Sequence, residues 1–178
     1  MNKDIMLSRL YRELADTLNI SETMTNEIVN SYKAVGSYLG NMEQELDINI
    51  YPQGSLSLGT MVRPIKDDNE GDYDVDLVCL LKNGQHLTPE EMKSIVGQRL
   101  SESERYSSML DEEGKRCWTL QYSDYHLDVL PCVPTALQES TDTKIRLSNK
   151  VDDGIYSTCF SNPKAYKEWF IGEMGTVF

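Results

Sequence analysis

Apolar residues recur at a helical spacing close to the start of the chain. They stand four residues apart, at Met6, Leu10, Leu14 and Leu18. Positions four apart lie on one face of an α-helix, so this pattern predicts a short amphipathic helix that ends near Asn19.

A longer apolar stripe follows this helix directly. Its members alternate spacings of four and three residues, and they are Ile28, Tyr32, Val35, Leu39, Met42 and Leu46. Ser21 precedes the stripe and has a side chain suited to a helix N-cap. A stripe of about five turns could form a coiled-coil seam, but this length is more typical of a long helix that lies on a domain core.

The hydrophobic period changes to two after the stripe. Residues 47–51 alternate polar and apolar side chains, and Pro52 ends the strand that this alternation predicts. Further strands are predicted over residues 73–81, 115–122 and 125–130, the last two as a tight hairpin, and helices over residues 88–103 and from Pro163 onwards. Helices come first and strands follow, interrupted by one helix. The expected fold is therefore α+β, an α/β sandwich with a mixed or antiparallel sheet and a long N-terminal helix.

The composition fits one domain. A chain of 178 residues with 39% hydrophobic side chains can bury a real core. Charges interrupt the N-terminal residues throughout, so neither a signal peptide nor a transmembrane helix is expected. The four cysteines form no CxxC pair, which gives a zinc site little support and fits free thiols in a reducing compartment. We therefore expect a cytoplasmic protein with no membrane partner.

The formal net charge is strongly negative, at −12. Nonspecific affinity for duplex DNA comes mostly from lysines and arginines that neutralise phosphates. The charge therefore weighs against DNA as a principal partner.

Acidic residues stand at the start of the strand predicted over residues 73–81. Side chains alternate along a strand, so Asp74 and Asp76 point to one side, together with Asp72. Residues two apart are roughly 6.5 to 7 Å apart, so their carboxylates can converge on a common cation and repel each other without one. An isolated DxD pair is a solvated strand end in roughly four cases out of five. Asp72 and Asp74 form a second candidate pair, but Asp74 and Asp76 lie nearer to the apolar part of the strand.

A third acid favours a cation site over a solvated strand end. Asp128 lies between Leu127 and Val129 in the strand predicted over residues 125–130. A charge in such a strand is costly to desolvate unless a cation compensates it. Three carboxylates on neighbouring strands can hold two Mg²⁺ ions about 3.5 to 4 Å apart.

The segment QGSLSLGT, residues 53–60, has the glycine spacing of a phosphate-binding Walker A loop, but Thr60 stands where that loop needs its lysine. A strand that ends at Gln53 and turns through Gly54 and Ser55 into a short helix would present backbone N–H groups and a hydroxyl to phosphate. No Walker lysine is needed if metal ions carry the positive charge.

Together these residues resemble the signature of a known family. Gly54-Ser55, Asp74-Val75-Asp76 and Asp128, in this order, resemble the polymerase-β-like nucleotidyltransferases. The surrounding sequences QGSLSLGTMVRP, DYDVDLVCLL, LDVLP and SNPKAYKEWF are similar to those of bacterial relatives of cyclic GMP-AMP synthase that serve in antiphage signalling. The likeness runs from about residue 20 to the C-terminus.

The resemblance implies a polymerase-β-like core and roles for individual residues. Asp74 and Asp76 would bind two Mg²⁺ or Mn²⁺ ions. Asp128 would bind one of these ions and assist deprotonation of the attacking hydroxyl. The residues implied to hold the triphosphate are Gly54 and Ser55, with Gln53 supporting the loop.

The implied activity is metal-dependent synthesis of a cyclic di- or trinucleotide from nucleoside triphosphates, ATP among them. The product would be a second messenger for a downstream effector that binds the product rather than the enzyme. Regulatory proteins of the defence system are further candidate partners. Two alternatives stay open: a minimal nucleotidyltransferase that modifies protein or RNA with NMP, and an inactive nucleotide-binding module.

The resemblance also divides the chain. Residues 1–178 would form a catalytic core, with N-terminal helices over residues 1–46, the sheet and active site over residues 47–160, and the start of a C-terminal helical lobe over residues 161–178. Family members are typically far longer. Three explanations would account for the shorter length of this chain: it is a fragment, a naturally split protein or a minimal transferase. We favour a truncated chain, which would turn over slowly or not at all.

Overall fold

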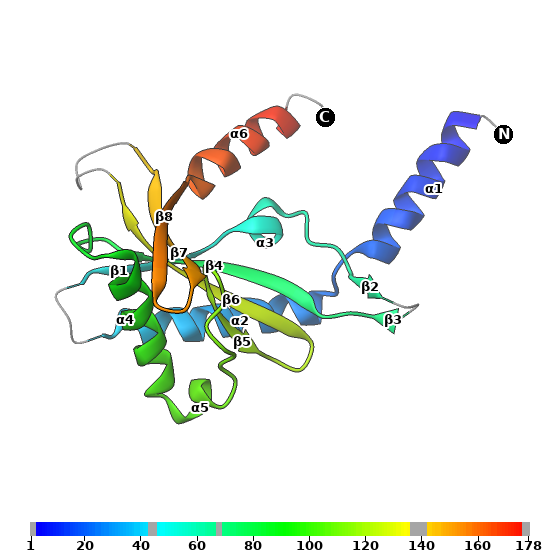
Figure 1. Cartoon of the computed structure of the whole chain (residues 1–178). Helices are drawn as coiled ribbons and strands as arrows, with labels where there is room; N and C mark the ends of the chain where they lie inside the picture. Colours follow the sequence, from blue (N-terminus) through cyan, green and yellow to red (C-terminus); the bar gives the residue numbers. More distant parts are fainter. Residues whose placement is uncertain (1–2, 43–45, 67–68, 136–141, 176–178) are drawn as a thin grey trace.

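A mixed β-sheet forms the centre of the fold (Figure 1). The computed structural model describes residues 3–42, 46–66, 69–135 and 142–175. In chain order the elements are α1 (Lys3–Leu18), α2 (Glu22–Gly40), β1 (Ile48–Pro52), α3 (Gly54–Leu58), β2 (Ile65–Lys66), β3 (Asn69–Glu70), β4 (Tyr73–Leu81), α4 (Pro89–Ser101), α5 (Glu104–Ser107), β5 (Trp118–Gln121), β6 (Tyr125–Pro134), β7 (Ile145–Asp152), β8 (Ile155–Ser161) and α6 (Pro163–Gly175).

The sheet combines one parallel pair with antiparallel neighbours. Its strand order is β1-β4-β6-β7-β8, and β5 also pairs with β6. β4 and β6 run parallel, whereas β1 is antiparallel to β4, β5 and β7 are antiparallel to β6, and β8 is antiparallel to β7. β2 and β3 form a separate two-stranded sheet. The predicted α+β class with a mixed sheet is confirmed.

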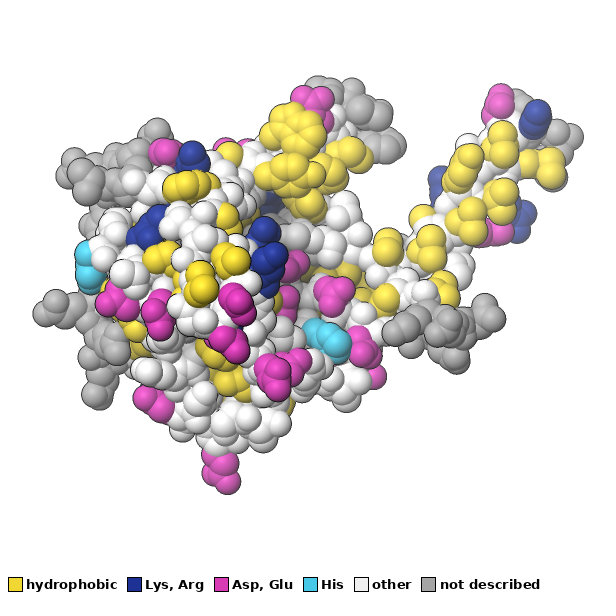
Figure 2. Space-filling model, viewed as in Figure 1, with side chains coloured by type: hydrophobic (Ala, Val, Ile, Leu, Met, Phe, Trp, Pro, Cys, Tyr) yellow, Lys and Arg dark blue, Asp and Glu magenta, His cyan; other side chains and the backbone are white. Residues whose placement is uncertain are grey.

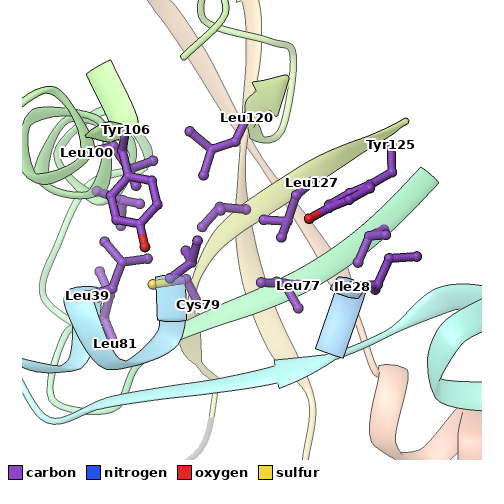
Figure 3. Close-up of a cluster of buried hydrophobic side chains, with 14 of the residues drawn as sticks. Ile28, Leu39, Leu77, Cys79, Leu81, Leu100, Tyr106, Leu120, Tyr125 and Leu127 are labelled. Atoms are coloured by element: carbon purple, nitrogen blue, oxygen red, sulfur yellow. The ribbon is translucent and has the colours of Figure 1, made fainter. Parts of the chain in front are cut away.

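The two faces of the central sheet carry different residues. Val75 and Leu77 of β4 belong to the same buried cluster as Ile28 and Leu39 of α2. Figure 3 shows this cluster between the helices and the central strands. Alternate residues of a strand point to opposite faces, so the acidic residues of β4 lie on the face away from α2.

The N-terminal helices follow the sequence pattern in part. α1 forms as expected, and Ser21 caps α2 by accepting a hydrogen bond from the Met24 N–H at 3.1 Å. α2 ends at Gly40, with Asn41 as its C-cap. The prediction that one helix continues along the stripe to Leu46 is therefore wrong. Glycine and asparagine end helices often, and here they outweigh the apolar spacing.

α1 extends away from the sheet, and none of its described residues is buried (Figure 1). Apolar side chains run along it and along α6 on the surface seen in Figure 2. On α1 the exposed large hydrophobic residues are Ile5, Met6, Leu7, Leu10, Tyr11, Leu14 and Leu18. Among the helices of the described ranges, none is long and apolar enough to cross a membrane.

The later strands differ more from the prediction. β5 and β6 form the expected tight hairpin, in which the Tyr122 N–H donates to the Tyr125 carbonyl oxygen at 3.0 Å. β5 is shorter than expected, and β6 continues to Pro134 because it stays paired with β4 and then with β7. The hairpin of β7 and β8 was not predicted. Its turn contains Gly154 at a φ of 68°, a conformation typical of hairpin turns, but polar strand residues hide the alternation.

The remaining helices begin at recognisable caps. Thr88 and Glu91 form a capping box at the start of α4. The helix expected over residues 88–103 is confirmed as α4, and Ser103 caps the separate short helix α5 that follows it. Before α6, the Asn162 side chain accepts a hydrogen bond from the Ala165 N–H at 3.1 Å and caps the helix that was expected from Pro163 onwards.

A buried ion pair joins α4 to the segment that precedes β5. Lys93 is fully buried, and its ammonium group lies 3.2 Å from the Glu113 carboxylate and donates to the Gly114 carbonyl oxygen. Glu113 also contacts Lys150 of β7 at 3.1 Å and accepts a hydrogen bond from the Tyr156 hydroxyl at 3.0 Å. Burial raises the pKa of Glu113, but hydrogen bonds from Lys150 and Lys93 outweigh it and bring the pKa below its ordinary value. Glu113 therefore ties α4, β7 and β8 to the approach of β5.

We expect Glu113→Gln to lower the free energy of unfolding by about 3 kcal/mol, because it leaves the buried Lys93 ammonium without its carboxylate. Adding Lys93→Met should restore most of the loss, since no unpaired buried charge remains. As a control, Asp47→Asn breaks an exposed ion pair with Lys82 and should cost less than about 1 kcal/mol. Urea unfolding measures all three variants, and equal losses for Glu113→Gln and Asp47→Asn would contradict the anchoring role.

Candidate active site

Asp76 and Asp128 lie opposite each other at the centre of the sheet. They are Cα partners in the parallel pair of β4 and β6, and both side chains are half-buried. Neighbouring strands are about 4.8 Å apart, so two side chains on the same face at this register are close neighbours. The strands thus bring together two of the three acids singled out in the sequence.

Burial and like charge act together on Asp76. Its pKa is raised, first by burial and then by the charges of Asp128 and Asp74. Asp74 lies on the same face, two positions earlier in β4, and its side chain is exposed. A carboxylate with these neighbours is the one that a bound cation would relieve most.

Asp72 lies at the exposed beginning of this strand. Its carboxylate is 3.2 Å from the imidazole of His126, and its side chain is 54% exposed. It therefore has its own partner away from the half-buried acids. This placement favours Asp74 with Asp76, rather than Asp72 with Asp74, as the acidic pair of β4.

The predicted phosphate loop contacts Asp76. The Gln53 N–H donates to the Asp76 carbonyl oxygen at 2.9 Å, and the chain then turns into the short helix α3. Gly54 has a φ of 60°, and a Cβ added there would lie 2.4 Å from Oδ2 of Asp76. Ser55 follows within α3. Only glycine allows the backbone to lie this close to the carboxylate, which explains the residue at position 54.

Two clefts meet at this loop. One, of about 520 Å³, is lined by Asp76, Asp128, Lys115, Arg116, Cys117, Leu130, Leu147, Cys159 and Phe160, together with Gln53 and Ser161. The other, of about 370 Å³, lies between α3 and the start of α6 and shares Gln53 and Ser161 with the first. Gly54 lines only the second cleft, whereas Ser55 and Asp74 line neither of these two.

The acids suit a hard divalent cation in their chemistry. Carboxylate oxygens are the ligands that Mg²⁺ and Mn²⁺ prefer, so Asp76 and Asp128 fit such an ion. Within the described ranges, however, no three His, Cys, Asp or Glu side chains gather closely enough to hold an ion. Asp74 is exposed beside the pair, and Asp128 is hydrogen-bonded to β5. The side chains as they stand form a two-acid site rather than a complete three-acid one.

β5 and Cys117, the residue before it, supply contacts to Asp128 that were not predicted from the sequence. The Thr119 hydroxyl donates to Oδ1 of Asp128 at 2.6 Å, and the Cys117 thiol lies 3.2 Å from Oδ2. Burial, followed by the charge of Asp128, raises the pKa of Cys117 to about 11, so the thiol keeps its proton at neutral pH. The signal was present in the hairpin: with Ser123 and Asp124 as a two-residue turn, antiparallel pairing places Thr119 opposite Asp128.

Known proteins resemble this chain in sequence and in fold. A family model described as the Second Messenger Oligonucleotide or Dinucleotide Synthetase domain matches residues 6–173. A protein of Roseivirga ehrenbergii named c-di-GMP synthase is 28% identical over 180 residues, and the alignment covers 96% of this chain and 44% of that protein.

Solved structures share the fold. The CD-NTase CdnG of Bradyrhizobium diazoefficiens, solved in complex with GTP, is 25% identical with a TM-score of 0.70, over 88% of this chain and 44% of that one. The CdnE c-UMP-AMP synthase of Rhodothermus marinus is 17% identical with a TM-score of 0.63, over 89% of this chain and 58% of that one, and supports the fold alone. This chain thus spans less than half the length of the Roseivirga and Bradyrhizobium proteins.

We expect Gly54→Ala to displace the Asp76 carboxylate, because the new Cβ would clash with its Oδ2 oxygen. Gly59→Ala is the matched control: Gly59 also has a positive φ, of 69°, but a Cβ there would meet nothing within 4 Å. Each variant should lose about 1 to 2 kcal/mol of stability through backbone strain. Crystal structures of both should show Asp76 moved only in Gly54→Ala, and an unmoved Asp76 there would refute the close approach.

We expect Asp76→Asn to stabilise the fold at neutral pH when EDTA removes divalent cations. The pKa of Asp76 is raised in the folded state, so the folded wild-type chain loses stability as the pH rises from the ordinary value of 3.8 through the raised pKa. Below this window Asp76 is protonated in both states, and the advantage of the variant should vanish. Thermal unfolding from about pH 3 to about pH 8 measures the difference.

As a control, Asp111→Asn should destabilise the fold at neutral pH, which is the opposite of the effect expected for Asp76→Asn. Hydrogen bonds from the Glu112 N–H and the Gln121 side chain lower the pKa of Asp111, so its charge stabilises the folded state at neutral pH. A neutral-pH gain from both variants would point to a general effect of reduced negative charge rather than to repulsion at Asp76.

Proposed function

The chain belongs to the family of Second Messenger Oligonucleotide or Dinucleotide Synthetase domains, and on that premise we propose that it is a nucleotidyltransferase core that makes a cyclic di- or trinucleotide from nucleoside triphosphates. The observation that carries the proposal is the pairing of Asp76 with Asp128 directly beside Gly54. The Roseivirga relative is named a c-di-GMP synthase, and the Bradyrhizobium structure contains GTP. These names support GTP, besides ATP, as a candidate substrate.

The proposed metal ligands are Asp74, Asp76 and Asp128. Two Mg²⁺ or Mn²⁺ ions bound there would neutralise phosphate charge and favour ionisation of the attacking hydroxyl. Asp128 would assist removal of the proton from that hydroxyl, as the family resemblance implies. Asp74 is exposed, so its side chain is free of tight packing and can turn toward Asp76.

The phosphate loop has a separate proposed role. Gln53, Gly54 and Ser55 would hold the triphosphate next to the acids. The absent Cβ of Gly54 lets the loop backbone lie against Asp76, so phosphate bound by the loop would lie near the carboxylates. Catalysis of phosphoryl transfer depends mostly on such positioning and on charge stabilisation.

The larger cleft has the chemical character that a nucleotide needs. Lys115 and Arg116 are exposed cations in its lining, and they can attract phosphate locally in a chain whose net charge is −12. Leu130, Leu147 and Phe160 supply apolar surface that could receive a base. The overall negative charge still weighs against duplex DNA as a partner.

The wider proposal follows the family. The core would comprise residues 1–178, with the sheet and the acids over residues 47–160 and α6 at the start of a helical lobe. Its product would act in the cytoplasm as a second messenger that a downstream effector binds. The pathway would serve antiphage defence, together with regulatory proteins of that system.

A labelling experiment tests the activity. The purified chain would be incubated with each α-³²P-labelled nucleoside triphosphate, singly and in pairs, with Mg²⁺ or Mn²⁺, and then treated with phosphatase. We expect a phosphatase-resistant small product that falls by about 100-fold or more in Asp76→Asn, which weakens the charge stabilisation. Asp72→Asn should retain the product, because Asp72 lies apart with His126.

Other outcomes separate the alternatives. Label that appears in protein or RNA, rather than in a small product, would show that the chain transfers NMP to a macromolecule and does not make a cyclic nucleotide. Nucleotide binding without label transfer, in this chain and in a longer chain like the relatives, would favour an inactive nucleotide-binding module. Equal loss of product in Asp72→Asn and Asp76→Asn would contradict the assignment of Asp76.

A further inference from the structure

Both carboxylate oxygens of Asp128 are engaged by side chains of the β5 segment. The Thr119 hydroxyl donates to Oδ1 at 2.6 Å, and the Cys117 thiol donates to Oδ2 at 3.2 Å. The shorter of these distances lies in the range of charge-assisted O–H···O⁻ hydrogen bonds, which are stronger than neutral ones. Asp128 therefore has a defined orientation in the described structure.

The sheet places Asp128 between a donor and a like charge. On β5 its Cα partner is Thr119, and on β4 its Cα partner is Asp76. Repulsion from Asp76 would turn the carboxylate, and rotation about its side-chain bonds would cost little in a half-buried site. The hydroxyl of Thr119 opposes this rotation on the side away from Asp76.

The donors themselves are held in place. The Lys150 N–H donates to the Lys115 carbonyl oxygen at 2.8 Å, just before Cys117. Glu113, two residues further upstream, joins the buried Lys93 and the Lys150 side chain. The segment that carries the donors is therefore fixed to α4 and β7, and it can hold Asp128 rather than follow it.

We propose that Thr119, assisted by Cys117, is a positioning residue that fixes the orientation of the Asp128 carboxylate before a cation or nucleotide binds. The inference rests on the proposed function, in which Asp128 is a metal ligand. Hydrogen-bond partners of a ligating carboxylate orient it, and their loss typically weakens metal binding or activity by about 10- to 100-fold. Thr119 belongs to neither buried cluster, whereas Cys117 packs against the smaller one, formed by Val78, Leu130, Cys132, Ile145 and Leu147.

The same contacts could instead hold Asp128 away from a cation. The two possibilities predict opposite changes in cation affinity when the Thr119 hydroxyl is removed. If the hydroxyl orients the ligand, its removal weakens cation binding, because the freed carboxylate must be ordered again on binding. If the hydroxyl competes with the cation, its removal strengthens binding. The short hydrogen bond leaves the remaining lone pairs of Asp128 available, which favours orientation over competition.

Three variants test the proposal. Thr119→Val removes the hydroxyl at nearly constant shape, and Thr119→Ser keeps it. Thr135→Val is the matched control, because it removes the same group from a hydrogen bond to the Lys144 carbonyl oxygen outside the clefts around Asp76. Crystal structures without metal give the orientation of Asp128, and calorimetric titration with Mn²⁺ alone gives cation affinity.

We expect the Asp128 carboxylate to turn or become disordered in Thr119→Val, with Mn²⁺ affinity about 10-fold weaker, whereas Thr119→Ser and Thr135→Val keep the wild-type values. An unchanged Asp128 orientation in Thr119→Val would overturn the proposal, and so would unchanged or tighter Mn²⁺ binding if the wild-type chain binds Mn²⁺. The crystal structures decide on orientation even if the wild-type chain binds no Mn²⁺ and makes no cyclic product, so failure of the positioning role and failure of the proposed function can be told apart.

Discussion

The opposition of two carboxylates on adjacent strands is the constraint on which the candidate site depends. Asp76 and Asp128 are register partners, and burial adds to the cost of their like charge. The strands cannot relieve this cost by sliding, because a shift of one residue would move Val75 and Leu77 out of the core. Compensation must therefore come from side chains and bound ions. Thr119 provides one part of it within the protein, and a divalent cation is the chemistry that suits the rest.

The main core makes this arrangement possible, because it packs on the face of β4 and β6 opposite to the acids. A smaller buried cluster, which includes Val78 and Leu130, lies further along the acidic face. One set of alternate residues packs against α2 and α4, while the other set presents the acids to the cleft. The buried pair of Lys93 and Glu113 links these two roles, since it fixes the segment before β5 from the core side. A substitution at Glu113 would thus shift the backbone of β5, and with it the hydrogen bonds to Asp128, although Glu113 itself does not contact Asp128. Such coupling requires a rigid segment between them, and the ion pairs provide it.

Much of the fold and of the candidate site is predictable from the sequence, for identifiable physical reasons. β4 was predictable to the residue because its buried alternation is long and bounded by polar segments. The loop at Gly54 and the acids were recognisable through their order along the chain. The end of α2 at Gly40 and Asn41 was not predicted because the apolar spacing continues past these two residues. The hairpin of β7 and β8 was not predicted because half of its residues are polar. Thr119 was not identified because the partners across a hairpin become apparent only when its register is counted.

The repulsion at the acids also bears on how a substrate would bind. A chain with a net charge of −12 opposes the approach of a free triphosphate, and the opposed acids add to this locally. A nucleotide that arrives with its divalent cation is less negative and relieves Asp76 and Asp128 at the same time. Nucleotide and cation should therefore bind with positive coupling, each lowering the electrostatic cost of the other. A positioned Asp128 strengthens this coupling, because the carboxylate need not be ordered again when the two arrive.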